Sequence, residues 1–332
     1  MFAEAISSIL DHHCTPAAVR AIEGGASAQP LAAALADAGF LELLASEDHG
    51  GGGASWRDFF EVVLLCGGYA VPLPVAQTMA TRLLTADPQG LPAGFITFAP
   101  ALTRRADGFL QASQVPCAAT ASHVVGLVEG ALLLLSIPQA HSAHSAIHGG
   151  LSASLCWPGD AGTVLQGGTA AAAFPYLGAL LHAGLLAGAM KRCFDLTIGY
   201  ANERVQFGKP IGKFQAVQHQ LSVMAEHVAA ARMASEAAFG IDALPTLPAC
   251  AVAKARTSEA AQLVASIAHA VHGAIGVTEE YDLQLFTRRL HEWRLVHGSE
   301  AHWHRLLGRL VLESPHRLSV DFVRTVWEGA PA

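Results

Sequence analysis

Residues 200–215 read YANERVQFGKPIGKFQ, and this stretch decides how the rest of the chain is interpreted. It joins two long segments that both have helical periodicity. A proline removes a backbone hydrogen-bond donor and clashes with the preceding turn, so Pro210 forbids a simple continuation of the helix that ends at Arg204. Arg204 therefore lies at a helix junction. A rigid guanidinium that is always charged is well suited there to binding a pair of phosphates bidentately.

The composition predicts a helix-rich chain of two or three sub-domains that is part of an oligomer. Apolar residues make up 52% of the 332 residues and charged residues only 14%, well below the usual quarter. Much of the apolar content is alanine, which favours closely packed helices. A surface so poor in charge suggests that other subunits cover part of it. The net charge of −7 and the lack of a basic stripe argue against nucleic acid as a partner.

Several features predict a cytoplasmic protein that does not span a membrane. The six cysteines are scattered without paired spacing, as expected of reduced thiols. The start, MFAEAISSILDHHC, lacks the basic segment and apolar core of a signal peptide. Residues 168–190 are apolar enough to resemble a membrane span. Pro175, Tyr176, His182 and the many small residues there favour a buried bundle helix instead.

The first predicted domain, residues 1–88, is helical. LAAALADAGFLELLA at 31–45 is apolar at helical spacing, and Ser55 is a plausible N-cap for the next helix. Four glycines at 50–53 follow Glu47-Asp48-His49 between these helices. They form either a loop that cradles a phosphate or a flexible turn. The turn is favoured, because no strand precedes the glycines and no GK[ST] follows them.

The second predicted domain, residues 89–172, is a small β-barrel or sheet. PQGLPAG marks its start, and four short apolar runs follow, each bounded by Gly, Pro, Ser or Asp. Runs of four to eight residues with such boundaries are typical of strands. The runs are FITFA, SHVVGLV, ALLLLSIP and LSASLCW.

The third predicted domain, residues 173–332, is a four-helix bundle. Apolar residues recur at alternating steps of four and three along one helix, as in the seam of a bundle: Val217, Leu221, Met224, Val228 and Ala231. PTLPAC at 245–250 separates this helix from the next, which we expect over 251–272 with its end at Gly273. Further helices are expected over 281–293 and 299–312.

This α+β arrangement of a helical domain, a β-domain and a helical bundle resembles the acyl-CoA dehydrogenase family. The resemblance is most specific in two motifs. AVHGAIG at 270–276 is similar to the family's Gln-Val-His-Gly-Gly-Ile-Gly, with Ala270 and Ala274 as departures. The other motif matches the family's flavin contacts at fixed offsets, through Arg204, Gln206, Phe207, Gly208, Pro210, Ile211, Phe214 and Gln215.

The resemblance implies that FAD is bound at a subunit interface. The bundle of one subunit would hold the pyrophosphate and adenosine of a flavin seated in its neighbour. Arg204 would pair with the pyrophosphate, Phe207 would pack on the nucleotide, and Phe214 and Gln215 would line the adenine side. The candidate cofactor residues are Arg204, Gln206, Phe207, Phe214, Gln215, Ala270, His272, Gly273, Ala274 and Gly276.

The family's catalytic base is missing from this sequence. The reaction removes the α-proton of an acyl thioester while the β-hydride passes to flavin, so a carboxylate must lie within reach of the α-carbon. Counting from Gly276, the usual glutamate position falls at His297, and an alternative position on the first bundle helix falls near Gly178. His297 and Glu300 are weak candidates, since either could be purely structural. The Thr-Glu-Pro and Gly-Ser-Asp residues that seat the flavin ring are absent as well.

A chain with the Arg204 motif but without these features resembles the shorter subunit of heteromeric acyl-CoA dehydrogenases. We therefore expect an acyl-CoA substrate and a paralogous partner in an α2β2 heterotetramer with two flavins. Three alternatives stay open. The chain could be a homo-oligomeric enzyme with a non-standard base, an interaction subunit that only completes a partner's FAD site, or a scaffold without flavin.

No metal site or nucleotide-triphosphate loop is predicted. The histidine clusters are His302-x-His304 and the loop-like set of His141, His144 and His148, and the loop-like set has no carboxylate or cysteine nearby. Residues two apart on a helix point about 200° apart, so His302 and His304 would face different sides. GKPIGK at 208–213 has three intervening residues rather than four and is followed by phenylalanine, so it is not a Walker A loop.

Overall fold

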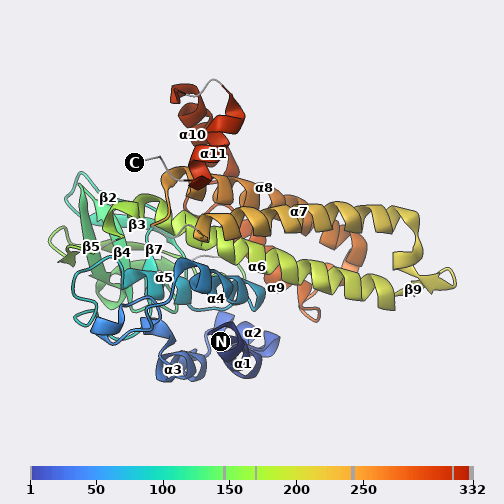
Figure 1. The fold of residues 1–332 in the computed structure, drawn as a ribbon. Helices are drawn as coiled ribbons and strands as arrows, with labels where there is room; N and C mark the ends of the chain where they lie inside the picture. Colours follow the sequence, from blue (N-terminus) through green and yellow to red (C-terminus); the bar gives the residue numbers. More distant parts are fainter. Residues whose placement is uncertain (1, 145–146, 169, 241–243, 316–317, 329–332) are drawn as a thin grey trace. The chain divides into compact units, whose positions relative to one another are not determined.

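A computed structural model of the chain describes residues 2–144, 147–168, 170–240, 244–315 and 318–328. Helices come first, strands follow, and helices return, which confirms the predicted α+β class (Figure 1). By internal contacts the chain forms two compact units. The first comprises Met1–Val62 and Val71–Leu181, and the second comprises Val63–Ala70 and His182–Ala332. The three-domain boundaries 1–88, 89–172 and 173–332 stay a prediction.

Short helices make up the N-terminal part of the chain. Ser55 Oγ accepts a hydrogen bond from the amide of Asp58 (3.1 Å), so the predicted N-cap of the fourth helix is confirmed. The elements are α1 (Phe2–His13), α2 (Pro16–Glu23), α3 (Gln29–Asp37), the 3₁₀ turns η1 (Phe40–Glu42) and η2 (Glu47–His49), α4 (Trp56–Gly68) and α5 (Val75–Thr81).

The glycine run after His49 is a packed turn. The amides of residues 50–54 all donate to carbonyls of residues 42–47, so none of them is free to bind a phosphate. A Cβ added to Gly51 would lie 2.2 Å from the carbonyl oxygen of Ala45, which explains why a glycine is needed there. The turn interpretation is therefore correct, although the turn is hydrogen-bonded rather than loose.

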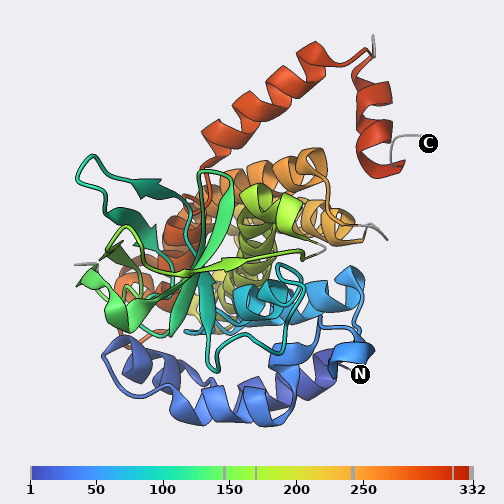
Figure 2. The same ribbon diagram turned by 90° about the vertical axis from the view of Figure 1, so that its left-hand side faces the viewer.

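The middle of the chain forms two four-stranded sheets (Figure 2, green). Their strand orders are β1-β4-β5-β8 and β2-β3-β7-β6. All neighbours are antiparallel except β1 and β4. The four predicted strands are present as β1, β4, β5 and β7. The full set is β1 (Ile96–Phe98), β2 (Leu102–Arg104), β3 (Leu110–Val115), β4 (His123–Val128), β5 (Ala131–Ser136), β6 (His141–His144), β7 (Ala153–Trp157) and β8 (Thr163–Leu165).

The two sheets share one apolar core. Leu110 and Leu155 come from one sheet, Val124 and Leu135 come from the other, and all four are at most 1% exposed. Trp157 is fully buried in this core, and its indole N–H donates to the carbonyl of Ser136 (2.7 Å). The polar end of the largest core side chain is therefore satisfied.

Long helices form the second unit. In the predicted bundle seam, Met224, Val228 and Ala231 are buried, whereas Val217 and Leu221 are only partly buried. α7 and α8 lie side by side (Figure 1). The helices are α6 (Phe174–Glu203, which begins in the first unit), α7 (Gln215–Phe239), α8 (Leu247–His272), α9 (Leu283–Trp293), α10 (Glu300–Glu313) and α11 (Ser319–Glu328). The last of these was not predicted.

Small residues allow the helices of this unit to pack closely, as the alanine and glycine content predicted. A Cβ added to Gly188 of α6 would lie 1.9 Å from the carbonyl oxygen of Leu64 in α4. Two segments, Ala171–Glu203 and Leu247–Val277, are long and apolar enough to cross a bilayer. The apolar window of the first is 89% buried, as in the core helix of a bundle.

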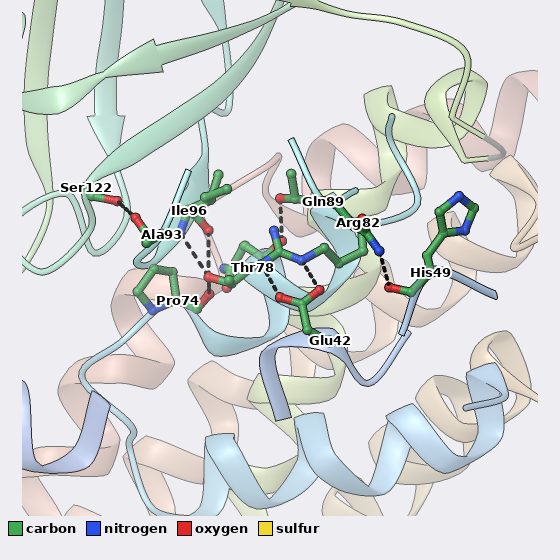
Figure 3. A network of polar contacts seen from close by, with 11 residues as sticks. Glu42, His49, Pro74, Thr78, Arg82, Gln89, Ala93, Ile96 and Ser122 are labelled. Atoms are coloured by element: carbon green, nitrogen blue, oxygen red, sulfur yellow. Dashed lines mark hydrogen bonds and ion pairs between the residues drawn. The ribbon is translucent and has the colours of Figure 1, made fainter. Parts of the chain in front are cut away.

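A polar network joins the N-terminal turns to α5 and β1 (Figure 3). The Arg82 guanidinium donates from Nε and Nη2 to the two carboxylate oxygens of Glu42, each at 2.6 Å. Thr78 Oγ1 accepts from the amide of Ile96 (2.9 Å) and donates to the carbonyl of Pro74 (2.7 Å). The Arg82 side chain is 6% exposed and that of Glu42 is 43% exposed.

We expect Glu42→Gln to lower the free energy of unfolding by about 1–3 kcal/mol, because it weakens a bidentate, charged hydrogen-bonded pair and leaves a buried guanidinium without its counter-charge. Glu129→Gln is the control, since it changes the exposed pair with Arg104 (3.2 Å, side chains 36% and 64% exposed) and should cost about 0–1 kcal/mol. Chemical denaturation followed by circular dichroism measures both. Equal losses would show that burial of Arg82 does not strengthen the pair.

Candidate functional site

The decisive stretch of sequence forms a two-residue β-hairpin between α6 and α7. β9 (Val205–Gln206) and β10 (Lys209–Pro210) pair antiparallel, and Phe207 (φ 50°) and Gly208 (φ 78°) form the turn. Positive φ at both central residues is the mark of a type I′ turn. Glycine adopts this conformation without cost, whereas phenylalanine is strained in it.

Arg204 lies at the base of the hairpin. Its amide donates to the carbonyl of Tyr200, and its carbonyl accepts from the amide of Ile211, both at 2.8 Å. The backbone of Arg204 is therefore fixed between helix and hairpin. Its side chain is exposed, and its guanidinium makes no hydrogen bond or ion pair with any residue that the structure describes.

An aromatic cluster extends from the hairpin tip towards α7. Phe207 is 91% exposed, and its ring lies edge-on to that of Phe214 with centroids 6.2 Å apart. The Lys209 ammonium lies 4.4 Å from the centroid of the Phe214 ring, within range of a cation–π contact. The tip thus presents a flat apolar surface beside positive charge.

The start of α7 can bind an anion. Phe214 is its N-cap and cannot accept a hydrogen bond through its side chain, and Gln215 is the first helical residue. The first amides of a helix have no partner within the helix and carry its positive dipole end. Together with the Arg204 guanidinium they suit a phosphate pair. The predicted residues Gln206 and Gln215 are both exposed at this place.

The second predicted motif lies at the end of α8. Gly273 has φ 65° and ψ −142°, which only glycine adopts readily, and nothing lies within 4 Å of an added Cβ. A ligand can therefore approach the backbone there. Gly276 differs, because an added Cβ would lie 2.9 Å from Cβ of His272, so this glycine serves packing. Ala270 and Ala274 are exposed and offer no polar side chain.

Tyr200 and His272 bring the two motifs together. Their rings stack with centroids 4.5 Å apart and an angle of 23°, and Tyr281 packs against both rings. His272 Nδ1 lies 2.8 Å from the carbonyl oxygen of Ala268, so this nitrogen carries the proton and donates it. Burial lowers the pKa of His272, which keeps the ring neutral. The role of Tyr200 and Tyr281 in joining the two motifs was not predicted. The one signal in the sequence is that Tyr200 precedes Arg204 by one helical turn, which places both residues on the same side of the helix.

His297, at the predicted position of the base, is enclosed. It has φ 55° in the turn between α9 and α10, and its Nε2 is buried with no hydrogen-bond partner among the described residues. The ring of His182 from α6 lies 5.1 Å away. Burial, followed by the charges of His182 and Lys254, holds the pKa of His297 well below its usual value. The imidazole is therefore a weak base that faces the interior.

Glu300, the other weak candidate, is held by an ion pair. Its Oε1 accepts from Nη2 of Arg294, and its Oε2 is buried without a hydrogen-bond partner in the described part of the chain. The charges of both residues of this pair act on Lys254, which was not predicted as a site residue. Burial lowers the pKa of Lys254 to about 7, against the raising effect of Glu300, while Arg294 lowers it further.

The histidine clusters of the sequence form no recognisable metal centre. Among the described residues, no group of three or more His, Cys, Asp or Glu side chains could hold a metal ion. His302 and His304 are both exposed on α10, and His304 Nε2 lies 4.0 Å from the Glu259 carboxylate. His141 and His144 are exposed on the edge strand β6.

Comparison with known proteins places this site in context. Residues 166–311 match the protein family described as "Acyl-CoA dehydrogenase, C-terminal domain". The chain is 28% identical to acyl-CoA dehydrogenase IpdE2 of Mycobacterium tuberculosis, over 99% of this chain and 97% of that relative. IpdE2 of Mycolicibacterium smegmatis is 42% identical over 113 residues, which span 34% of this chain and 35% of that relative.

Two solved structures share the fold. A chain of the ChsE4-ChsE5 complex from Mycobacterium tuberculosis superposes with a TM-score of 0.81 and 22% identity, and covers 95% of this chain and 97% of that one. The Tcur3481-Tcur3483 steroid ACAD G363A variant gives a TM-score of 0.82 and 23% identity, over 94% of this chain and 96% of that one. The architecture is therefore the acyl-CoA dehydrogenase fold.

Three findings point to acyl-CoA dehydrogenases. They are the matched C-terminal domain, the relative aligned over nearly its whole length, and the fold. Nearly the whole chain is therefore similar in sequence and fold to acyl-CoA dehydrogenases, and residues 166–311 match the C-terminal domain of that family. Members of this family are FAD-dependent oxidoreductases, so the predicted enzyme class and the predicted cofactor, FAD, are confirmed. The roles predicted for individual residues stay predictions.

We expect acid to destabilise the protein partly through His297. In the unfolded chain this histidine takes up a proton as the pH falls through about 6.5, whereas in the folded chain it does so only at much lower pH. The unfolded state then binds more protons, so the free energy of unfolding falls between about pH 7 and 5, by up to about 1.4 kcal/mol per pKa unit of difference.

His297→Asn removes this titration and tolerates the left-handed backbone, so its stability should fall less between pH 7 and pH 5. His141→Asn, on the exposed strand β6, is the control and should behave like the wild type. Urea unfolding at several pH values measures the three proteins. Parallel pH profiles for wild type and His297→Asn would contradict the assignment of a neutral, enclosed imidazole.

Proposed function

We propose that this chain is the subunit without a catalytic base in a heteromeric, FAD-dependent acyl-CoA dehydrogenase. One contrast within the second unit carries the proposal. The groups suited to the FAD pyrophosphate are exposed, and Arg204 has no partner among the described residues. The position of the catalytic base, in contrast, holds an enclosed imidazole.

The residues at the hairpin fit the anionic part of FAD. Arg204 would bind the pyrophosphate bidentately, and the first amides of α7 would donate to the same oxygens. The nucleotide would pack on Phe207, and the open backbone at Gly273 would allow the adenosine to approach closely. FAD, when bound, supplies the acceptor for the hydride from the β-carbon of the acyl group.

Neither of the two candidate bases that the structure describes, His297 and Glu300, is suited to accept the α-proton. A general base needs access to the proton that it removes and enough basicity to hold it. His297 lacks both properties, since its free nitrogen is buried and its pKa is well below the usual value. Glu300 is bound to Arg294. The base would therefore be supplied by the partner, whose own FAD site this chain completes.

Exposed apolar side chains around the hairpin support an obligate complex. Phe207 is 91% exposed, Val205 58%, Ile275 38% and Val277 69%. Such a surface is unfavourable in water and is typical of a protein interface. The ChsE4-ChsE5 structure, which shares the fold, is a complex of two different chains. We propose a cytoplasmic α2β2 heterotetramer with two flavins.

The substrate in this proposal is a bulky or branched acyl-CoA thioester. If the partner holds the acyl chain, the middle domain of this chain need not close over it, which leaves room for a large group. A second protein with the same fold is described as a steroid ACAD, and this favours a steroid side chain among the bulky candidates.

Arg204→Ala should weaken the affinity of the complex for FAD by at least about tenfold and lower its FAD content on purification, because a charged bidentate hydrogen bond of roughly 1.5–3 kcal/mol is lost. Flavin absorbance per mole of complex, together with titration of FAD into the apo-complex, measures the loss. Arg192→Ala removes an exposed arginine from the same helix and serves as the control. Unchanged flavin content and affinity in Arg204→Ala would remove Arg204 from the site.

The second prediction concerns assembly and catalysis. Light scattering of the co-expressed complex should give the mass of an α2β2 tetramer with two flavins. The chain alone should not bleach flavin when acyl-CoA is added without oxygen, because neither His297 nor Glu300 is available as a base. A stable monomer, or a homotetramer with one flavin per chain, would refute the heteromer. Bleaching by the chain alone would show that it carries its own base.

A further inference from the structure

Lys254 is a buried cation surrounded by oxygen atoms. The residue is 0% exposed in the middle of α8. Its ammonium lies 2.8 Å from Ser258 Oγ, 3.2 Å from the carbonyl oxygen of Trp293, 2.9 Å from that of Arg294 and 3.0 Å from that of Gly298. Ser258 Oγ in turn donates to the carbonyl of Arg294 (3.1 Å).

The carbonyls that Lys254 contacts lie around the end of α9 and in the turn that follows. The last carbonyls of a helix have no amide partner within the helix and carry the negative end of its dipole. A buried cation is tolerated only where such groups replace water. Since an ammonium has three hydrogens and a neutral amine has two, three carbonyl partners and a serine oxygen favour the charged form.

The turn that receives these hydrogen bonds is strained. His297 and Gly298 both have positive φ, at 55° and 98°. A Cβ added to Gly298 would lie 2.8 Å from Nε1 of Trp303, whose indole N–H donates to the carbonyl of His297 (3.1 Å). Left-handed backbone persists only where the surroundings hold it, and the ammonium and the indole supply such contacts on the two sides of this turn.

We infer that Lys254 is the positioning residue of the turn 294–298, where its ammonium acts as an internal cation that fixes the backbone on both sides of position 297. The direction in which the side chain at 297 projects therefore depends on α8. The significance of position 297 for catalysis rests on the proposed function, whereas the role of Lys254 rests on the contacts described above.

Lys254→Met tests this inference, because methionine approximates the length of the lysine side chain but has no ammonium. The full chain is studied without flavin at pH 6, below the pKa of about 7 that burial gives Lys254, so that the wild-type side chain is charged. Hydrogen exchange followed by mass spectrometry compares residues 294–299 with α7. We expect exchange at 294–299 to accelerate at least about tenfold, with α7 unchanged, since hydrogen bonds to a charged group are lost.

A rescue experiment separates the charge from the volume of the side chain. Lys254→Ala opens a cavity that ethylammonium can enter, and we expect this cation to restore slow exchange at 294–299. Tetramethylammonium, which has the same charge and no hydrogen to donate, should not restore it. His297→Asn should leave exchange at 294–299 unchanged, because the imidazole does not hold the backbone.

Three results would overturn the inference. They are unchanged exchange at 294–299 in Lys254→Met, equal acceleration throughout α7, and equal rescue by both cations. If neither lysine variant folds, Ser258→Ala is measured in the same way. It should accelerate exchange at 294–299 by at least about threefold, since it removes the hydrogen bond that Ser258 Oγ donates to the carbonyl of Arg294 and the one that it accepts from the Lys254 ammonium. No acceleration would again overturn the inference. These measurements do not involve flavin, so their outcome and that of Arg204→Ala are independent.

Discussion

The stacking of Tyr200 on His272 is the contact on which the arrangement of the candidate site depends. It joins the end of α6, which has 30 residues, to the end of α8, which has 26. Arg204 follows Tyr200 by one helical turn, and Gly273 follows His272 directly. Arg204 and the open backbone at Gly273, 69 residues apart in sequence, thereby each follow closely on one of two residues whose rings stack.

Helix α8 carries one solvent-exposed region and one buried region that both bear on the candidate site. Its C-terminal end opens to solvent at Gly273, whereas its middle holds Lys254 beneath an interior turn. The open place leaves the backbone accessible at Gly273, whereas in the interior one the ammonium of Lys254 is enclosed by carbonyl oxygens. In the function proposed above, FAD binding and proton transfer would therefore depend on side chains along different parts of α8 and could be separated within one fold.

The features that could be predicted are those that depend on local sequence. Pro210 indicated the interruption after α6, Gly273 the end of α8, and Ser55 the start of α4. Strand β6 could not be predicted, because HSAH is exposed along its whole length and has no alternating pattern. The role of Lys254 depends on carbonyls about 40 residues away. Its only local signal is a lysine on the apolar side of an alanine-rich helix.

The backbone at Phe207 has a consequence for the evolution of this chain. Asparagine or glycine would adopt the left-handed conformation at φ 50° more easily, and either would remove an apolar ring that is 91% exposed. Phenylalanine at this position thus makes the isolated chain less stable and less soluble than it could be. Selection for stability alone would remove this ring. In the proposed heteromer, selection on the assembly would retain it, and the cell would have to match the supply of this chain to that of the partner that covers it.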